Sequence, residues 1–235
     1  MFAISEDKNG NILAAGHNSG LNILDKKKNT ISHLFNDLKN ANSLCSNYIL
    51  TIYTDSQGIV WLGTYHGLGR WDQETNTFTN YYHNDFDKSS MSHDWVYSIT
   101  EDSKHNLWVG TAAGLNLFNR GTKKFQSFTR KNGFANDVIN GILEDNKGYL
   151  WLSTNGGLVI FNPVTKKVRN FDISDGLPGN EFMKCAFHKG KKGELYFGNT
   201  KGLVYFLPES IKTNTIIPPV YITDFYIKKY SSTCG

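Results

Sequence analysis

Short apolar runs alternate with turn-forming residues along most of the chain, and the pattern returns about every 45 residues. In one such unit, an apolar and β-branched run at 47–54 precedes the turn sequence Asp-Ser-Gln-Gly at 55–58. Three more strand-like runs follow at 59–64, 68–72 and 77–82. Aspartate at a tight turn accepts hydrogen bonds from nearby backbone N–H groups, and glycine adopts the positive φ that such turns need. Each unit therefore predicts four short antiparallel strands.

The units share a core of Asp, Gly, Trp, Gly, Thr and Gly-Leu at fixed spacing. Three copies are clear, at 55–68, 102–115 and 145–158, and degenerate copies stand at 7–21 and 190–203. The tryptophan position is occupied in turn by Leu13, Trp61, Trp108, Trp151 and Tyr196. Four strands per unit, repeated at this period, are typical of a β-propeller in which each blade packs face to face on the next. The sequence therefore predicts an all-β propeller with five four-stranded antiparallel blades.

Most of the repeated residues are expected to be structural. One aspartate per blade suits a turn, whereas a catalytic or metal site rarely needs one copy per blade. The tryptophans are expected to fill the space between blades, each burying on the order of 200 Å². Structural roles are assigned to Asp55, Trp61, Asp102, Trp108, Asp145, Trp151 and Tyr196. A second recurrent position precedes the first strand of a blade and is expected to form an Asx turn; its occupants are Asn47, Asp94, Asp137 and Asn180.

The propeller segment is predicted to span residues 2–210. Its blades are expected at about 2–41, 42–88, 89–132, 133–174 and 175–210. The last blade is incomplete, because no Phe-x-x-[Phe/Tyr] strand follows the run at 202–207. We therefore expect a segment of a larger ring, or blades whose exposed edges pair with something else. Residues 211–235 break the period with a Pro-Pro linker, and a strand-like run at 220–227 follows.

The charge and cysteine content exclude several classes of function. The 25 basic and 21 acidic residues give a net charge of +4, and this small, dispersed surplus argues against a nucleic-acid interface. The three cysteines are widely spaced and fit neither a zinc pattern nor a disulfide framework, so Cys45 and Cys185 are interpreted as core residues. No signal peptide and no apolar run of the ~20 residues that cross a bilayer is found.

No catalytic signature stands out from the repeat. The sequence contains no G-x-S-x-G motif, P-loop, H-E-x-x-H motif or EF-hand loop, and its histidines match no ligand spacing. The aspartate turn resembles the Asp-box of sialidase-like propellers. It carries one extra residue between Asp and Trp, however, and no arginine triad accompanies it. We therefore predict no catalytic residue, no metal site and no cofactor.

Residues that differ between the copies are better functional candidates than those that repeat. In a propeller, the loop before the first strand of a blade and the loop between its second and third strands open on the same face. An exposed Trp95–Tyr97 pair on that face would suit a polar, partly planar ligand such as a sugar. The alternative, that Trp95 packs under its own loop, stays open. The candidate ligand-binding residues are Tyr65, His66, Trp95, Tyr97, Asn140, Asn155, Glu181 and Lys201.

One unit resembles a known repeat closely. Residues 91–102 read Met-Ser-His-Asp-Trp-Val-Tyr-Ser-Ile-Thr-Glu-Asp, with Trp-Val-Gly-Thr at 108–111 and Gly-Leu at 114–115. This unit resembles the two-component regulator propeller repeat, and the resemblance extends over about residues 2–210. The run at 218–225 is similar to the first strand of the Tyr-rich immunoglobulin-like domain that follows such propellers.

The resemblance implies a periplasmic sensor region of a membrane-bound hybrid histidine kinase of Bacteroidetes type. Such a region detects glycan fragments, signals through a dimer and contains two seven-bladed propellers, so this chain would be the last five blades of the second ring. We expect a non-catalytic segment with a carbohydrate ligand and self-association in the full-length protein. No nucleic-acid partner is expected, and membrane contact would occur only through regions outside this chain. The alternatives are a lyase or glycosidase acting on polysaccharide, or a pure protein-interaction scaffold.

Overall fold

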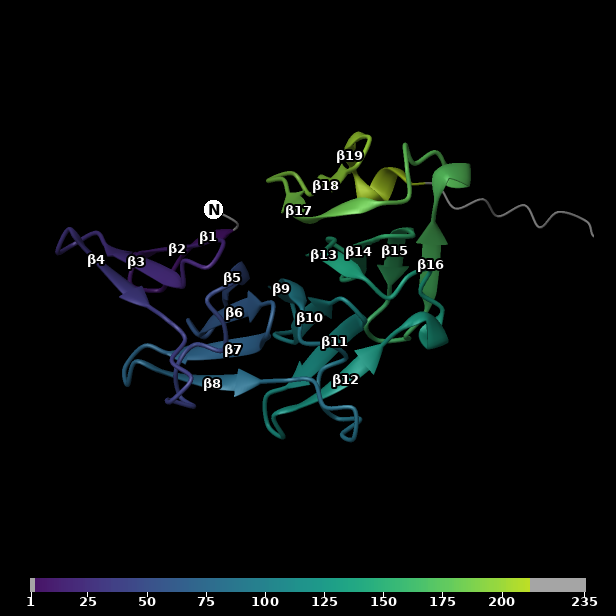
Figure 1. Ribbon diagram of the computed structural model, residues 1–235. Helices are drawn as coiled ribbons and strands as arrows, with labels where there is room; N and C mark the ends of the chain where they lie inside the picture. The colour runs from purple at the N-terminus through teal and green to yellow at the C-terminus, as the bar shows by residue number, and fades with distance from the viewer. Residues whose placement is uncertain (1–2, 212–235) are drawn as a thin grey trace, which may run out of the picture.

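The computed structural model describes residues 3–211, and these form an all-β propeller of five blades (Figure 1). The strand-like run expected at 220–227, and the immunoglobulin-like domain that it would begin, lie outside the described residues. Within them, no helix is long and apolar enough to cross a membrane.

Four blades have four antiparallel strands each, and the fifth has three described strands. The first blade consists of β1 (Ala3–Glu6), β2 (Ile12–Ala15), β3 (Leu21–Asp25) and β4 (Thr30–Leu34). The second consists of β5 (Ile49–Thr54), β6 (Val60–Thr64), β7 (Gly67–Asp72) and β8 (Thr77–Tyr81). The third consists of β9 (Val96–Glu101), β10 (Leu107–Thr111), β11 (Gly114–Asn119) and β12 (Lys124–Phe128).

The fourth blade consists of β13 (Ile139–Glu144), β14 (Leu150–Thr154), β15 (Gly157–Phe161) and β16 (Val168–Phe171). The fifth consists of β17 (Phe182–Lys189), β18 (Leu195–Asn199) and β19 (Gly202–Phe206). Short 3-10 helices stand at Arg130–Asn132, Ile173–Asp175 and Pro208–Ser210. The first strands of the blades, β1, β5, β9, β13 and β17, neighbour one another in order around the centre (Figure 1).

The aspartate of each clear repeat holds the first hairpin and the buried tryptophan together. Asp102 Oδ1 accepts from the backbone N–H groups of Lys104 and Asn106 at 3.0 and 2.9 Å. Its other oxygen, Oδ2, accepts from the indole N–H of Trp108 at 2.8 Å. The same indole bond joins Trp61 to Asp55 and Trp151 to Asp145, each at 2.9 Å. One carboxylate thus satisfies both a tight turn and a buried indole, which is why the two residues recur together.

Each blade packs its tryptophan face on the next blade. Trp61 and Leu68 of the second blade lie in one buried cluster with Val96, Leu107 and Phe118 of the third. Gly110 permits the third and fourth blades to approach each other closely, because a Cβ there would lie 3.0 Å from the carbonyl oxygen of Ile139. The core is therefore a series of layers between blades, stabilised by the burial of aromatic and aliphatic surface.

The fifth blade departs from this pattern. Gly190 stands where the other blades have aspartate, and Tyr196 stands where blades two to four have tryptophan. The Tyr196 ring stacks on Tyr205 with centroids 5.7 Å apart, and Leu203 beside them is 66% exposed. The face that every other blade covers with its neighbour is open here within the described residues.

The residue before the first strand does not form the Asx turn that the sequence suggested. Asp94 Oδ1 instead accepts from the backbone N–H of His83, eleven residues earlier, at 2.6 Å. Asn47, Asp137 and Asn180 make the equivalent bonds to the backbone N–H groups of Asn36, Arg130 and Ile173. These side chains therefore close the loop between two blades rather than a local turn. The prediction was wrong because sequence spacing does not reveal a partner seven or eleven residues away.

Candidate functional site

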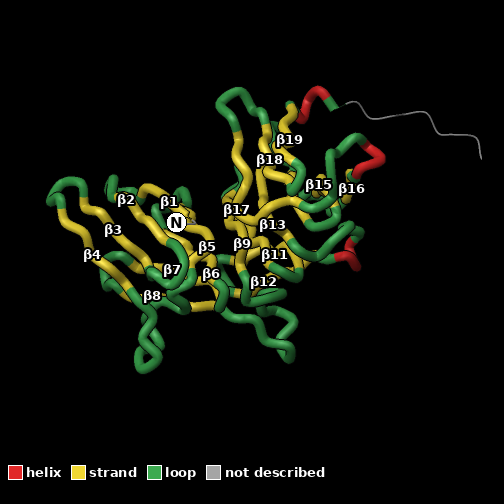
Figure 2. Tube along the Cα trace, turned by 45° about the horizontal axis from the view of Figure 1, so that its top comes forward, coloured by secondary structure: helices red, strands yellow, loops and turns green. Residues whose placement is uncertain are grey.

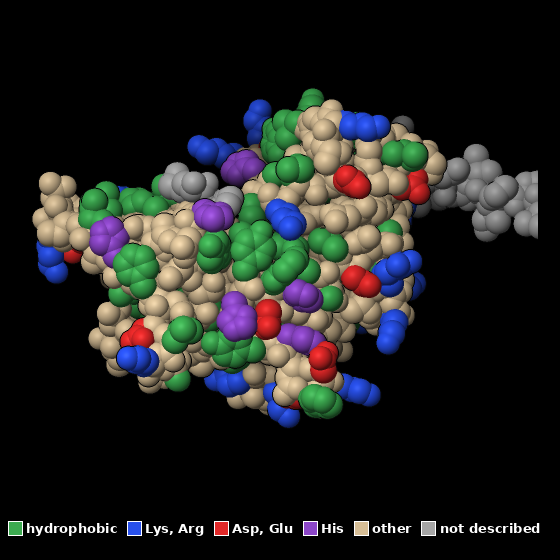
Figure 3. Space-filling model, in the orientation of Figure 1, with side chains coloured by type: hydrophobic (Ala, Val, Ile, Leu, Met, Phe, Trp, Pro, Cys, Tyr) green, Lys and Arg blue, Asp and Glu red, His purple; other side chains and the backbone are tan. Residues whose placement is uncertain are grey.

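Aromatic rings from the first three blades form a continuous row on the loop face of the propeller. His17, in the β2–β3 loop, contacts Tyr48 with ring centroids 4.8 Å apart, and Tyr48 lies 6.4 Å from Tyr65 in the β6–β7 loop. Tyr65 contacts Trp95 at 5.5 Å, and His93 contacts the same indole at 5.3 Å. These five residues are called the aromatic row below. On the face shown in Figure 3, histidine and hydrophobic side chains gather over the middle of the molecule.

The row follows from how neighbouring blades meet. The start of β7 in the second blade bonds to the loop that enters the third blade, because Gly67 N–H donates to the Asp94 carbonyl at 2.9 Å. The equivalent bond joins Gly20 to the Asn47 carbonyl at 3.1 Å. At each of these contacts, a residue from the loop between the second and third strands of one blade therefore lies beside a residue from the loop before the first strand of the next blade. The third-blade loop has Ala112 in the equivalent position, so the row ends at Trp95.

A lysine from the fifth blade reaches the end of the row. Lys184 Nζ lies 6.0 Å from the Trp95 ring centroid and 4.3 Å from the Tyr97 ring centroid. The backbone permits this because the pairing of β17 with β18 shifts register between Phe182 and Phe187. Cys185, inside this bulge, has φ 57°. A lysine ammonium against the face of an aromatic ring is attracted by its quadrupole.

The bulge also carries β17 across the first strands of other blades. The Cys185 thiol donates to the Leu50 carbonyl of β5 at 3.4 Å and lies 3.6 Å from the Tyr97 carbonyl of β9. In Figures 1 and 2 β17 lies beside β13, and it also contacts β9. The fifth blade therefore supplies a cation to a site built mainly by blades one to three.

Two candidates from the sequence, Tyr65 and Trp95, lie in the aromatic row. Trp95 is 45% exposed, so the indole presents much of its surface to solvent instead of packing under its own loop. The expected exposed Trp95–Tyr97 pair is wrong for its second member. Tyr97 is only 2% exposed, because the first four residues of β9 are all buried and Lys184 covers its ring.

The other candidates are separated from the row. Asn140 is fully buried, and its Nδ2 donates to Asn155 Oδ1 at 2.8 Å and to the Phe182 carbonyl at 2.9 Å. His66 is exposed and contacts Tyr82, with ring centroids 5.4 Å apart.

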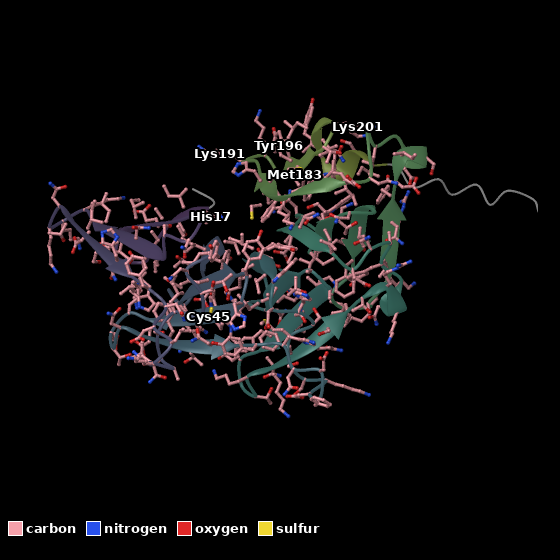
Figure 4. All side chains as sticks on the ribbon, viewed as in Figure 1. His17, Cys45, Met183, Lys191, Tyr196 and Lys201 are labelled. Atoms are coloured by element: carbon pink, nitrogen blue, oxygen red, sulfur yellow. The ribbon has the colours of Figure 1, made fainter. Side chains whose placement is uncertain are left out.

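Glu181 and Lys201 are exposed on the fifth blade, where the Glu181 carbonyl accepts from Thr200 N–H at 3.0 Å. In Figure 4, Lys201 lies on the fifth blade, away from His17. Neither residue is brought into the aromatic row.

Four residues of the site were not assigned from the sequence: His17, Tyr48, His93 and Lys184. The first three stand in the two kinds of loop that the repeat had already marked. His17 and Tyr48 lie one blade before assigned candidates, and His93 lies two residues before Trp95. A comparison of those positions in every blade would have found them. Lys184 gave no such signal, because its position depends on the β17 bulge.

The chemical groups of the aromatic row are those of aromatic side chains, imidazoles and one lysine. In residues 3–211 no group of three or more His, Cys, Asp or Glu side chains could hold a metal ion. The row offers aromatic faces, imidazole and phenol hydrogen-bonding groups and one ammonium. These groups can stack on a planar or ring-shaped ligand and bond to its polar substituents.

Cys45 is expected to be inert in the folded protein. Burial raises the pKa of the Cys45 thiol to about 11, although its Sγ lies 3.5 Å from Thr64 Oγ1 and that contact favours the thiolate. Because the thiolate is the nucleophile, iodoacetamide at pH 8 should leave Cys45 unmodified in the native protein and modify it in urea. Peptide mass spectrometry measures this. Equal modification in both conditions would contradict the burial.

Comparisons with known proteins bear on the repeat and on the fold. Residues 43–66, 90–113 and 133–156 match the family described as two component regulator propeller. A stretch of 64 residues is 38% identical to Histidine kinase P4 of Formosa agariphila. That match covers 27% of this chain and only 5% of the kinase, so the chain spans a small part of that protein.

Two solved structures share the fold. PorZ of Porphyromonas gingivalis, a surface component of the type-IX secretion system, is similar with a TM-score of 0.67 and 14% identity, over 87% of this chain and 31% of that chain. Virginiamycin B lyase from Staphylococcus aureus is similar with a TM-score of 0.64 and 15% identity, over 87% of this chain and 69% of the lyase. Identities this low establish a common propeller architecture and nothing about ligand or activity.

Proposed function

The chain carries two-component regulator propeller repeats, and we propose that it is a non-catalytic, ligand-sensing segment of a two-component sensor. Its location would be periplasmic or extracellular, and its signal would pass through contacts between copies of the full-length protein. The proposed ligand is a glycan fragment. The partial match to a histidine kinase supports the sensor role.

The aromatic row is the observation that carries this proposal. Sugar rings present a flat C–H face that stacks on aromatic side chains, and hydroxyl groups that bond to phenol and imidazole. Trp95 is 45% exposed in the middle of such groups, with Lys184 Nζ 6.0 Å from its ring. Exposed apolar side chains that form one contiguous patch, as the rings of the aromatic row do, are typical of a binding surface.

Replacing Trp95 with alanine should weaken oligosaccharide binding at least tenfold, which corresponds to about 1.4 kcal/mol. Titration calorimetry with a panel of neutral and acidic oligosaccharides measures the affinity of the parent and of Trp95→Ala. Phe86→Ala is the matched control, because Phe86 is 99% exposed and is not part of the row. Equal affinity in Trp95→Ala and the parent would refute the site, and release of a shortened product would support a propeller enzyme instead.

We also propose that the five blades are part of a seven-bladed ring. Two apolar blade faces support this. On the first blade, Ile4 and Ile31 are 62% and 64% exposed on the face turned away from the second blade. On the fifth blade, Leu203 and Tyr205 are 66% and 67% exposed on the opposite face. Further blades packed between these two faces would bury both, and sedimentation or scattering of a longer chain would test the closure.

A further inference from the structure

A lysine ammonium borders the aromatic row at its Trp95 end. Lys184 Nζ lies 4.3 Å from the ring centroid of Tyr97 and 6.0 Å from that of Trp95. The ammonium therefore covers the buried Tyr97 ring and stands at the side of the Trp95 indole, which is 45% exposed. A ligand that stacks on this indole would meet the charge of Lys184.

The ammonium of Lys184 is not engaged by another polar group of the described residues. Within residues 3–211 Lys184 forms no ion pair, and its Nζ makes no hydrogen bond. A ring face attracts the positive charge but leaves the three N–H groups of an ammonium free to meet oxygen acceptors. Lys184 can therefore bind an anion without first breaking an ion pair.

The acidic residues that are near in sequence are directed elsewhere. Asp94 follows His93, but its Oδ1 accepts from the His83 backbone N–H at 2.6 Å, in the connection between two blades. Glu181 stands three residues before Lys184, is exposed and forms no ion pair with another described residue. The row itself contains no acidic residue, so the charge that borders it is positive.

The backbone holds Lys184 in this place. Cys185, the next residue, has φ 57°, and its thiol donates to the Leu50 carbonyl at 3.4 Å and lies 3.6 Å from the Tyr97 carbonyl. These carbonyls belong to β5 and β9, so the bulge in β17 is attached to the second and third blades. Met183, the residue before Lys184, marks this part of β17 in Figure 4. A lysine on an anchored backbone loses less freedom on binding than one on a loose loop.

A sugar ring on Trp95 would bring its substituents to this ammonium. Carbon atoms of stacked rings are in contact at about 3.5–4.0 Å. A carboxylate or sulfate on the edge of the sugar then lies beside the indole, where Lys184 Nζ stands 6.0 Å from the ring centre. The flexible stem of a lysine can close a hydrogen bond of about 2.7–2.9 Å to such an oxygen. A neutral hydroxyl in the same position would form a bond roughly half as strong.

We propose that the aromatic row takes a sugar with an anionic substituent, a carboxylate or a sulfate, and that Lys184 selects for this charge. The inference rests on the proposed function, because it presupposes that a glycan binds the row. It makes Lys184 a specificity-determining residue, whereas Trp95 supplies a stacking surface that acidic and neutral sugars share.

Matched pairs of glycans test the preference for charge. An oligogalacturonate is compared with its methyl ester, and a sulfated chondroitin oligosaccharide with its unsulfated form. Titration calorimetry of the full chain at pH 8, where histidine is largely neutral, measures each affinity. The charged member of at least one pair should bind at least tenfold more tightly. A preference in the first pair identifies a carboxylate as the recognised group, and a preference in the second identifies a sulfate.

Variants of Lys184 test which residue reads the charge. Lys184→Gln should reduce the preference to less than about threefold, and Lys184→Arg should retain most of it because the positive charge remains. Lys189→Gln is the matched control, since Lys189 is an exposed lysine at the other end of β17. Its preference should equal that of the parent. A preference that survives in Lys184→Gln, or that is lost equally in Lys189→Gln, would overturn the role of Lys184.

Hydrogen exchange gives a second readout that does not depend on affinity. The charged member of a pair should slow exchange in the β17 amides at least threefold, because it contacts Lys184, and the neutral member should protect only the loops of the aromatic row. Protection of β17 by both members, or by neither, would overturn the proposal.

Failure of this inference and failure of the proposed function give different results. Trp95→Ala should weaken both members of a pair alike, because both stack on the indole. Equal affinities within each pair, or binding of neutral oligosaccharides alone, would overturn the preference for charge and leave a glycan sensor in place. Absence of binding by every glycan would refute the proposed function and this inference together.

Discussion

Replacing Trp108 with alanine is expected to lower the free energy of unfolding by about 3–5 kcal/mol. Trp108 is fully buried, and its ring centroid lies 6.0 Å from Phe128 and 5.8 Å from Phe161 of the next blade. The substitution leaves a cavity between two blades and removes the indole donor from Asp102 Oδ2, a bond of 2.8 Å. For a chain of this size the midpoint of thermal unfolding should fall by roughly 6–20 °C.

Two variants separate the packing loss from the loss of the hydrogen bond. Trp108→Phe keeps much of the apolar surface but removes the donor to Asp102, so it should destabilise by about half as much. Phe86→Ala is the exposed aromatic control and should change stability by less than about 0.5 kcal/mol. Urea unfolding followed by circular dichroism measures all three. A midpoint for Trp108→Ala equal to that of Phe86→Ala would show that the layer between the third and fourth blades does not contribute to stability.

Replacing Arg120 with methionine is expected to destabilise the protein by about 3 kcal/mol, at the low end for a broken buried ion pair. Arg120 donates to Asp55 at 2.8 Å and to Glu101 at 3.0 Å, so one guanidinium bridges the second and third blades. The side chains of the two acids are 0% and 5% exposed. Methionine would leave Asp55 without a cation and Glu101 with only the His105 imidazole, 3.5 Å away. Asp55 keeps its bond from the Trp61 indole, which limits the loss.

The matched control for Arg120→Met is Arg130→Met. Arg130 is exposed and forms no ion pair with another described residue, so its replacement should be close to neutral. Adding Glu101→Gln to Arg120→Met should recover part of the stability, because it removes one of the two buried charges. If Arg120→Met unfolds at the same urea concentration as Arg130→Met, the bridge between the blades contributes nothing measurable.

Much of the fold could be predicted from the sequence, because the signals that specify it are local. The turn at Asp102 and the buried Trp108 are six residues apart, and their hydrogen bond recurs at the same spacing in two other blades. A period of this kind reveals strands, turns and the number of blades without any alignment. The absence of a fourth strand in the region up to residue 210 was visible in the same way.

The site was harder to predict, because it depends on contacts between blades. Tyr97 and Trp95 are two residues apart in the sequence, yet one is 2% and the other 45% exposed. Asn140 was expected to bind ligand but is buried and bonded to Asn155 and to the Phe182 carbonyl. Trp95 lies just before β9, whereas Tyr97 and Asn140 lie in first strands whose first four residues are all buried, so alternation along the sequence does not predict their exposure.

The sequence by itself determined the repeat, the hairpins and the layered aromatic core, because each of these depends on residues only a few positions apart. Only the tertiary structure decided which loop residues meet, since His17 and Trp95 belong to different blades and are joined into one row through Tyr48 and Tyr65. It also decided that Lys184 reaches this row, through a bulge that no spacing rule reveals. The physical reason is that a blade repeats its own contacts, whereas a binding surface is built from the residues that do not repeat.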